Sequence, residues 1–248
     1  MSRVVLITGG AKGIGRAIAL ELAGHGYDIA VNYLTSEREA GELVAMVREK
    51  FGVNAMALRA DVSRQQEVEE MFKEIEEELG AVDVLINNAA VDLSNLFHLK
   101  TAEEFRRTLD VNVVGAYNCA VRAAGHMKEK GFGRIVNIAS TNGINTYYPM
   151  SFDYDASKAA LISLTHDLAW QFAPEVNVNA IAPGFIGTES ELEGYDEAFL
   201  KQEEQKIMVG RYGRPEEVAY LVRFLISDEA AYINNTVIRI DGGQPGRC

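Results

Sequence analysis

The sequence predicts an α/β protein in which a doubly wound parallel sheet of seven strands carries helices on both faces. Short apolar runs rich in β-branched residues alternate along the whole chain with longer segments whose apolar residues recur at helical spacing. The 248 residues, 48% of them hydrophobic, are enough for one large core. No repeat, low-complexity linker or shift in composition divides the chain. We therefore expect a single domain over residues 1–248.

The expected elements follow one another in strand–helix order. The strands are expected at "RVVLIT", "DIAVNY", "NAMALRA", "VDVLINN", "RIVNIAS", "VNVNAIA" and "TVIRID". Helices are expected over residues 13–25, 36–50, 64–79, about 102–129 and 153–172. One long irregular stretch, residues 183–213, follows the sixth strand. We expect it to form a substrate loop or lid, because loops of this length in compact domains usually have a function.

The charge and composition argue against several classes of partner. The formal net charge is -12 at neutral pH, so nucleic acids and anionic membranes would repel the surface. Cys119 and Cys248 are too few for a disulfide framework, and the apolar run "VVLI" is too short for a signal or membrane segment. The four histidines lack metal-ligand spacing. We expect a cytoplasmic protein without a metal.

The segment "TGGAKGIGRA" follows the first expected strand directly and opens the first helix. Gly9, Gly13 and Gly15 would let the backbone pass close to a phosphate, and a helix N-terminus attracts anions through its free amides and its dipole. The spacing differs from G-x-G-x-x-G, so the glycines alone could equally do no more than shape a strand-to-helix turn. With the alternating strands around it, the segment favours a Rossmann-type dinucleotide-binding domain.

Tyr154 and Lys158 stand four positions apart in "FDYDASKAALISL", a segment expected to be helical. On a helix, these two positions share one face. An isolated pair of this kind is most often an ordinary part of a solvated surface. The motifs elsewhere in the chain decide between that role and a chemical one.

Four motifs in this order resemble the short-chain dehydrogenase/reductase family. They are the glycines of the first turn, "NNAA" at residues 87–90, Ser140 at the end of the fifth strand, and Tyr154-x-x-x-Lys158. Each motif alone is weak, but four of them on the right elements are specific, and the resemblance covers essentially the whole chain. With "IAPGFIGTE" and "IDGG", the pattern looks most like 3-oxoacyl-(acyl-carrier-protein) reductases and glucose 1-dehydrogenase-type relatives.

The resemblance implies an oxidoreductase that interconverts a carbonyl and a secondary alcohol by hydride transfer with NAD(P)(H). Its catalytic residues would be Asn112, Ser140, Tyr154 and Lys158. Its cofactor contacts would be Thr8, Gly9, Lys12, Gly13, Ile14, Gly15, Asn32, Tyr33, Ser36, Asp61, Val62, Asn88, Ala89, Ala90, Tyr154, Lys158, Pro183, Gly184, Ile186 and Thr188.

Each catalytic residue has an expected role. Tyr154 would act as general acid in carbonyl reduction and as general base in alcohol oxidation. The Lys158 ammonium, one turn away, would stabilise the phenolate and lower the pKa of Tyr154 from about 10. Ser140 would donate a hydrogen bond to the substrate oxygen, where negative charge develops. By the resemblance, Lys158 also holds the nicotinamide ribose, and Asn112 anchors a water that links Lys158 to solvent.

The chain departs from the family pattern in two places. Ala90 stands where the family most often has glycine, which bears on the backbone shape after the fourth strand. The interval from Ser140 to Tyr154 is one residue longer than usual, so the intervening chain must bulge. Tyr147 and Tyr148 lie in that interval, but neither has a lysine four residues later. Tyr154 is therefore the candidate.

The end of the second strand bears on the choice between NAD(H) and NADP(H). An acidic residue there would bind the adenosine ribose and repel a 2'-phosphate, but the chain has Asn32. Lys12, Ser36 and Arg38 offer hydrogen bonds and positive charge to that phosphate. NADP(H) is therefore favoured. NAD(H) is the alternative, and in that case Lys12 and Arg38 are ordinary solvated cations.

The expected substrate is a small-molecule or acyl-carrier carbonyl compound. An acidic carrier protein needs a basic patch near the site, and Lys128, Lys130 and Arg134 could supply part of one. Glu175 speaks against this, because such reductases tend to carry arginine near its position. The alternative is a sugar, polyol or small-ketone dehydrogenase of the same family. A regulator that senses NADP(H) without turnover is a third hypothesis, although such relatives usually lose the tyrosine or lysine kept here.

Relatives of this kind pair their subunits into a homotetramer. The resemblance assigns the contacts to helices at about 102–129 and 153–172 and to the last strand with its preceding helix. Small residues at Ala156, Ala160 and Ser163 would let two copies of the second helix approach closely. We therefore expect a homotetramer.

Overall fold

The computed structural model describes residues 2–194 and 196–246. Within these residues, the centre is one sheet of seven parallel strands in the order β3-β2-β1-β4-β5-β6-β7. The strands span Val4–Ile7 (β1), Asp28–Tyr33 (β2), Ala55–Arg59 (β3), Val82–Asn87 (β4), Gly133–Ile138 (β5), Val176–Pro183 (β6) and Val237–Ile240 (β7). The predicted fold class and all seven predicted strands are confirmed.

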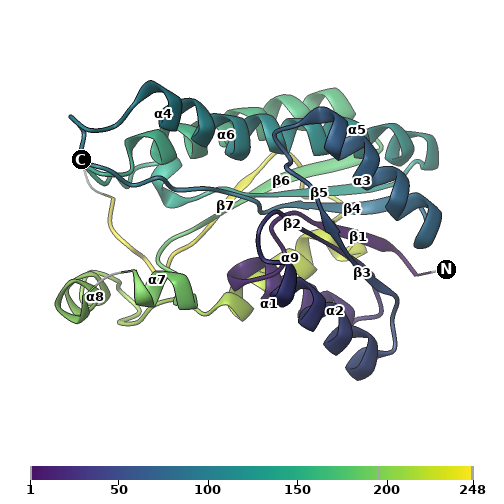
Figure 1. The fold of residues 1–248 in the computed structure, drawn as a ribbon, viewed down its shortest axis with the longest axis horizontal. Helices are drawn as coiled ribbons and strands as arrows, with labels where there is room; N and C mark the ends of the chain where they lie inside the picture. The colour runs from purple at the N-terminus through teal and green to yellow at the C-terminus, as the bar shows by residue number, and fades with distance from the viewer. Residues whose placement is uncertain (1, 195, 247–248) are drawn as a thin grey trace.

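Helices cover both faces of the sheet (Figure 1). One face carries α1 (Gly13–Ala23), α2 (Glu37–Phe51) and α9 (Pro215–Ile226), and the other carries α3 (Gln65–Glu78), α4 (Ala102–Leu109), α5 (Gly115–Lys130) and α6 (Phe152–Phe172). The predicted helices agree with these to within two residues at either end. The helix predicted at 102–129 has three parts, because a π-helical turn at Asp110–Val114 joins α4 to α5.

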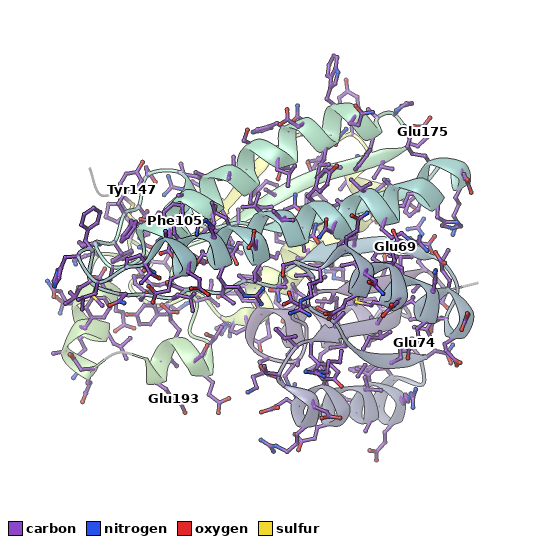
Figure 2. The ribbon with its side chains drawn as sticks, turned by 45° about the horizontal axis from the view of Figure 1, so that its top comes forward. Glu69, Glu74, Phe105, Tyr147, Glu175 and Glu193 are labelled. Atoms are coloured by element: carbon purple, nitrogen blue, oxygen red, sulfur yellow. The ribbon has the colours of Figure 1, made fainter. Side chains whose placement is uncertain are left out.

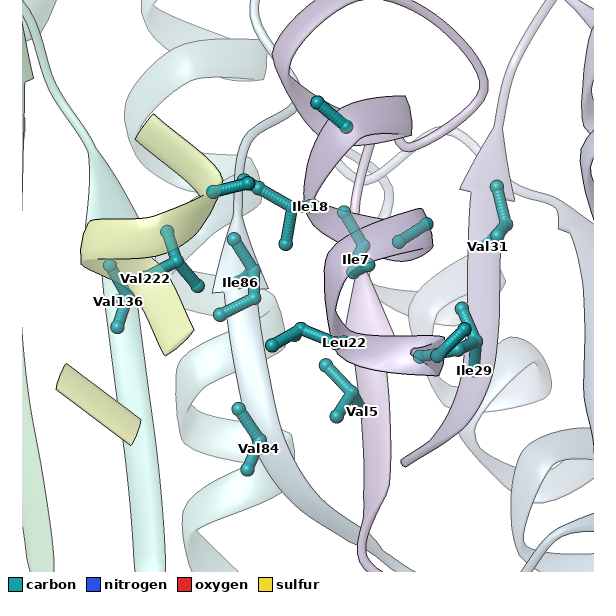
Figure 3. Close-up of a cluster of buried hydrophobic side chains, with 14 of the residues drawn as sticks. Val5, Ile7, Ile18, Leu22, Ile29, Val31, Val84, Ile86, Val136 and Val222 are labelled. Carbon is teal, nitrogen blue, oxygen red and sulfur yellow. The ribbon is translucent and has the colours of Figure 1, made fainter. Parts of the chain in front are cut away.

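Two apolar layers hold the helices against the sheet. Figure 3 shows the layer under α1 and α9, where Leu22 and Val222 pack with the strand residues Val5 and Ile86. All four side chains are fully buried. The layer on the other face contains Phe72 of α3. At about 1.5–3 kcal/mol for each large apolar side chain removed from water, these layers are the main source of stability.

The strand order reverses between β1 and β4, which are neighbours with Ile7 opposite Ile86. Because all strands run the same way, the turn after β1 and the loop after β4 begin side by side at the carboxyl edge. The chain then continues towards opposite halves of the sheet. Open α/β sheets bind their ligands in the crevice that forms at such a point.

The stretch at 183–213, expected to be irregular, contains two short helices. They are α7 at Glu189–Glu193 and α8 at Glu197–Glu204, which stand to one side of the body in Figure 1. The side chains of Thr188 and Asp196 cap these helices by accepting hydrogen bonds from backbone amides three residues further on. The prediction of an irregular segment is therefore wrong, while the role of a lid stays a prediction.

Among the described residues, no helix combines the length and the apolar character that a membrane span requires. Cys119 is buried in α5 as a free thiol, and burial raises the pKa of that thiol to about 12. Cys248 lies outside the described residues.

Candidate active site

A cavity of about 380 Å³ opens at the carboxyl edge of the sheet, where the strand order reverses. Its wall comes from the turn after β1, the loops after β4, β5 and β6, and the first turns of α6. The predicted site residues in this wall are Lys12, Gly13, Ile14, Asn88, Ala90, Ser140, Tyr154, Lys158, Pro183, Gly184, Ile186 and Thr188. The structure thus brings the glycine turn and the tyrosine–lysine pair to one cavity.

The glycine turn has a backbone shape that residues with side chains rarely adopt. Gly9 and Gly13 have φ angles of +59° and +52°. A Cβ atom at Gly9 would lie 2.9 Å from Cα of Ala89, and one at Gly13 would come within 3.4 Å of Thr188. Side chains would therefore close the space in front of α1, whose N-terminus has no side-chain cap. These free amides fit the pyrophosphate of an NAD(P) cofactor.

Thr8 and Asn88 fasten the glycine turn to the loop after β4. The Thr8 hydroxyl accepts hydrogen bonds from the backbone amides of Asn88 and Ala89, both at 3.0 Å. The Asn88 side-chain amide donates to the carbonyls of Thr8 and Gly9, again at 3.0 Å. Ala90 has no positive φ angle. Alanine therefore fits this position without backbone strain, and the departure from glycine has no visible cost.

Asn32 lies beneath the glycine turn and is only 2% exposed. Its Oδ1 accepts a hydrogen bond from the amide of Gly9 at 3.2 Å, and its Nδ2 donates to the carbonyl of Ala60 at 3.0 Å. The structure therefore differs from the expectation that Asn32 faces the adenosine ribose. The side chain is used within the protein, where it supports the glycine turn from β2.

The other predicted cofactor contacts also lie outside the cavity wall. They are Thr8, Gly9, Gly15, Tyr33, Ser36, Asp61, Val62 and Ala89. Their contact with a cofactor stays a prediction.

Asp61 is stabilised as a carboxylate. Burial raises the pKa of Asp61, but hydrogen bonds from Ser63 and Arg107 outweigh burial and hold that pKa below its ordinary value.

The two cations expected at a 2'-phosphate share one glutamate. Lys12 Nζ lies 2.9 Å from Oε1 of Glu39, and an Nη atom of Arg38 lies 3.4 Å from the same oxygen. The Lys12 side chain is 59% exposed. An ion pair as exposed as this one contributes little to stability. The Lys12 ammonium can therefore leave Glu39 and bind a phosphate instead.

Ser140 follows β5 and caps the start of a 3-10 turn at Thr141–Gly143. Its hydroxyl oxygen accepts a hydrogen bond from the backbone amide of Asn142 at 3.1 Å. The turn packs directly on α6, because a Cβ atom at Gly143 would lie only 2.6 Å from the carbonyl carbon of Lys158. This close packing brings the Ser140 side chain near enough to the phenol of Tyr154 to lower the pKa of that phenol.

Tyr154 has its pKa shifted in the direction opposite to the prediction. Burial raises the pKa well above the ordinary value, the carboxylates of Asp92 and Glu191 raise it further, and the hydrogen bond with Ser140 lowers it only in part. The Lys158 nitrogen lies 5.3 Å from the centroid of the tyrosine ring. The prediction was wrong because the loss of hydration outweighs the nearby ammonium. Tyr154 therefore keeps its proton at neutral pH.

Lys158 lies at the buried end of the site and is 2% exposed. Its ammonium donates a hydrogen bond to the carbonyl of Ile138 at 2.8 Å. Burial lowers the pKa of Lys158 from 10.5 to about 8. The charge of this residue is therefore easily lost just above neutral pH.

Asn112 lies in the π-helical turn between α4 and α5 and is 1% exposed. Its side chain accepts a hydrogen bond from the amide of Val91 at 2.8 Å and donates to the carbonyl of the same residue at 2.9 Å. It also donates to the Ser157 hydroxyl at 3.0 Å. Asn112 thus ties the loop after β4 to α6. Its water-mediated link to Lys158 stays a prediction.

The two tyrosines rejected from the sequence lie in different places. Tyr147 is 53% exposed at the molecular surface (Figure 2) and does not line the cavity. Tyr148 does line it, but its hydroxyl donates a hydrogen bond to Glu203 at 3.3 Å. Of the three, Tyr154 alone has both Ser140 and Lys158 beside it.

The basic residues expected to receive a carrier protein lie at the wrong edge of the sheet. Lys128 and Lys130 lie in the last turn of α5, and Arg134 is the second residue of β5, so all three are at the amino edge, opposite the cavity. Lys130 pairs with Asp83, and Arg134 is buried. The prediction of a basic patch near the site was therefore wrong.

Several residues of the cavity wall were not singled out from the sequence. Among them are Asp92, Phe185 and Glu191. Asp92 and Phe185 lie a few residues after the ends of β4 and β6. This position was the signal in the sequence that could have identified them as part of the site. Nothing in the sequence indicated that Glu191, on α7, turns towards Tyr154.

Comparisons with known proteins agree with this geometry. A family model described as enoyl-(acyl carrier protein) reductase matches residues 9–244. The chain is 36% identical to 3-oxoacyl-(acyl-carrier-protein) reductase FabG of Staphylococcus aureus over 98% of both chains. Among solved structures, acetoin dehydrogenase YohF from Salmonella typhimurium is 35% identical, with a TM-score of 0.86 over 98% of this chain and 97% of that one. A Serratia marcescens short-chain dehydrogenase/reductase mutant is 32% identical, with a TM-score of 0.90 over 97% of both chains.

The fold and the cavity define an NAD(P)-dependent oxidoreductase. The chain belongs to the short-chain dehydrogenase/reductase family, and the resemblance found in the sequence is confirmed. Among the described residues, no group of three histidine, cysteine or acidic side chains is arranged to hold a metal ion.

The lowered pKa of Lys158 predicts a pH-dependent stability in the cofactor-free protein. Below pH 8 the lysine is charged in both states, and holding that charge in the buried site costs about 3 kcal/mol. Between pH 8 and about 10 the folded state releases the proton first, so the stability rises with pH. Lys158→Met removes this term. The excess stability of Lys158→Met over the wild type should therefore shrink across this range in urea unfolding.

Lys128→Met, on the exposed end of α5, is the control and should show no such change with pH. A constant difference between wild type and Lys158→Met from pH 7 to 10 would contradict the buried, destabilised ammonium.

Proposed function

We propose that this chain interconverts a ketone and a secondary alcohol with NADP(H), using Tyr154 as general acid and base. The observation that carries the proposal is the placement of Tyr154, Ser140 and Lys158 on one cavity with the uncapped N-terminus of α1. The α1 end fits the pyrophosphate, and the tyrosine end fits a reacting carbonyl. A single catalytic domain over residues 1–248, active in the cytoplasm, is part of the same proposal.

The chemistry divides between cofactor and protein. A bound NADP(H) supplies or accepts the hydride. In reduction, the Tyr154 hydroxyl gives its proton to the substrate oxygen, and the Ser140 hydroxyl donates a hydrogen bond to the same oxygen. The raised pKa of Tyr154 keeps the proton on the phenol until the substrate oxygen becomes basic enough to accept it. Lys158 lies beside the ring and is available to return a proton to the phenol.

The substrate is proposed at the level of an uncharged carbonyl compound. The name of the Staphylococcus aureus relative supports a 3-oxoacyl thioester, and the name of the Salmonella typhimurium structure supports a small hydroxyketone. We do not propose that an acidic carrier protein docks near this cavity, because the basic residues expected to receive it lie at the opposite edge of the sheet. The sensor hypothesis is disfavoured, because the catalytic side chains are in place.

Tyr154→Phe tests the proposed role directly. Removal of the hydroxyl takes away only the proton donor, so kcat for carbonyl reduction should fall by about 10²- to 10⁴-fold. NADPH binding, measured by fluorescence titration, should change little. Tyr147→Phe is the matched control and should keep near-normal activity. Near-normal activity in Tyr154→Phe would mean that another group supplies the proton.

NADP(H) is proposed over NAD(H) because Lys12 lines the cavity and its ion pair with Glu39 is exposed. Lys12→Met should lower the ratio of kcat/KM for NADPH to that for NADH about ten-fold, because a charge-assisted contact with the 2'-phosphate is lost. Glu39→Gln should raise the same ratio by freeing Lys12. Lys50→Met, at the far end of α2, is the control. An unchanged ratio in Lys12→Met would remove the support for NADP(H).

We also propose a homotetramer, because exposed apolar side chains gather on the helices that the resemblance assigns to subunit contacts. Tyr117 and Val121 lie exposed one turn apart on α5, and Val114 is exposed at the end of the π-helical turn before it. Trp170 is 85% exposed on α6. Ala156 and Ser163 on α6 are also exposed, and Ala160 is half-buried. Faces of this kind are normally covered.

Sedimentation at micromolar concentration should give about four times the chain mass of 27.2 kDa. Tyr117→Asp should yield smaller species, because it places a charge in the buried contact. Met46→Asp, on the exposed face of α2, should leave the assembly intact. A fully active wild-type monomer would refute the tetramer.

A further inference from the structure

The charges on the cavity wall are unevenly divided. Among the described wall residues, the charged side chains are Lys12, Asp92, Lys158 and Glu191. Lys12 pairs with Glu39 beside the glycine turn, and Lys158 donates to a backbone carbonyl. Within the described part of the chain, neither Asp92 nor Glu191 takes part in an ion pair. The substrate side of the cavity therefore carries two carboxylates, neither of which is ion-paired with a described residue.

Asp92 is held firmly at the mouth of the cavity. It accepts hydrogen bonds from the hydroxyls of Ser94 at 2.8 Å and Ser151 at 3.2 Å. The same loop is anchored to α6 by Lys100, whose buried ammonium lies 2.9 Å from the carboxylate of Asp153. The side chains of both partners in this pair are at most 2% exposed. Asp92 therefore has a fixed position relative to Tyr154.

Glu191 approaches the same space from α7. It is half-buried, one turn beyond Thr188. Asp92, Glu191 and Tyr154 line the same cavity. Burial raises the pKa of Glu191, and the carboxylate of Asp92 raises it further. Burial is also the largest cause of the raised pKa of Tyr154, to which both carboxylates add. The part of the substrate next to its reacting carbon must therefore lie in the space that these three side chains line.

Glu191 is half-buried, and a carboxylate partly removed from water needs hydrogen-bond donors. A substrate with a hydroxyl or ammonium group close to its carbonyl would supply them, whereas a substrate carboxylate would meet two like charges. We propose that Asp92 and Glu191 select substrates with a hydrogen-bond donor near the reacting carbonyl, a hydroxyketone, sugar or amino ketone, and reject keto acids. This inference rests on the proposed function and specifies the substrate of the same site.

Four small ketones that differ in one group test the selection. They are hydroxyacetone, aminoacetone, butanone and pyruvate, reduced with NADPH at pH 7. We expect kcat/KM for hydroxyacetone or aminoacetone to exceed that for butanone about ten-fold or more, since a hydrogen bond to a charged group contributes that much. Pyruvate should be the poorest of the four. The order of the two donor-bearing ketones identifies the donor as hydroxyl or ammonium.

Glu191→Gln should reduce the preference for the donor-bearing ketone over butanone and raise the relative use of pyruvate about ten-fold. Asp92→Asn should act in the same direction with a smaller effect, because Asp92 is exposed and its charge is screened. Glu193→Gln is the matched control on α7, since Glu193 is exposed and extends away from the body (Figure 2). The Kd for NADPH should be the same in all variants.

The outcomes separate the two proposals. Turnover of all four ketones at similar kcat/KM, or the same ranking in Glu191→Gln as in the wild type, would overturn the carboxylate selection and leave the proposed function standing. Binding of NADPH without turnover of any ketone, by the wild type, would overturn the proposed function and the selection with it.

Discussion

The common direction of the seven strands is the constraint on which the site depends. Because every strand points the same way, the segments that leave β1, β4, β5 and β6 all emerge at one edge. Residues that are far apart in the sequence therefore lie together at this edge. The hydrogen bonds between Thr8 and Asn88 fix the two central segments to each other, and Asn112 fixes the second of them to α6. The cavity is thus a direct product of the topology.

Burial sets the chemistry within that frame. It raises the pKa of Tyr154 and lowers that of Lys158, so it disfavours the charged form of each group. A neutral phenol is the form that a proton donor needs, and the neighbouring carboxylates reinforce it. This is the protonation state that carbonyl reduction requires of Tyr154. A charge brought in by a substrate or cofactor would shift this balance, since it would enter a region with little water.

The sequence alone was sufficient for the architecture. Alternating apolar runs predicted the strands, and the family resemblance predicted that Ser140, Tyr154 and Lys158 share one site, where the structure brings them together. The sequence was not sufficient to predict the direction of the Asn32 side chain. Side chains along a strand point alternately to opposite faces, so a shift of one residue decides whether Asn32 faces the ligand or the protein interior. The pKa of Tyr154 depends on hydration, which a one-dimensional pattern does not contain. The basic patch was a different error: α5 runs against the strands, so its end had to lie away from the cavity.

We infer that one cavity holds the dinucleotide and presents Tyr154 to the reacting carbon. A crystal structure with NADP+ would test this inference. We expect the pyrophosphate against the amides that open α1, between Gly13 and Thr188, and the nicotinamide in the part of the cavity lined by Tyr154 and Lys158. A nicotinamide bound away from Tyr154, or a pyrophosphate outside the glycine turn, would contradict it.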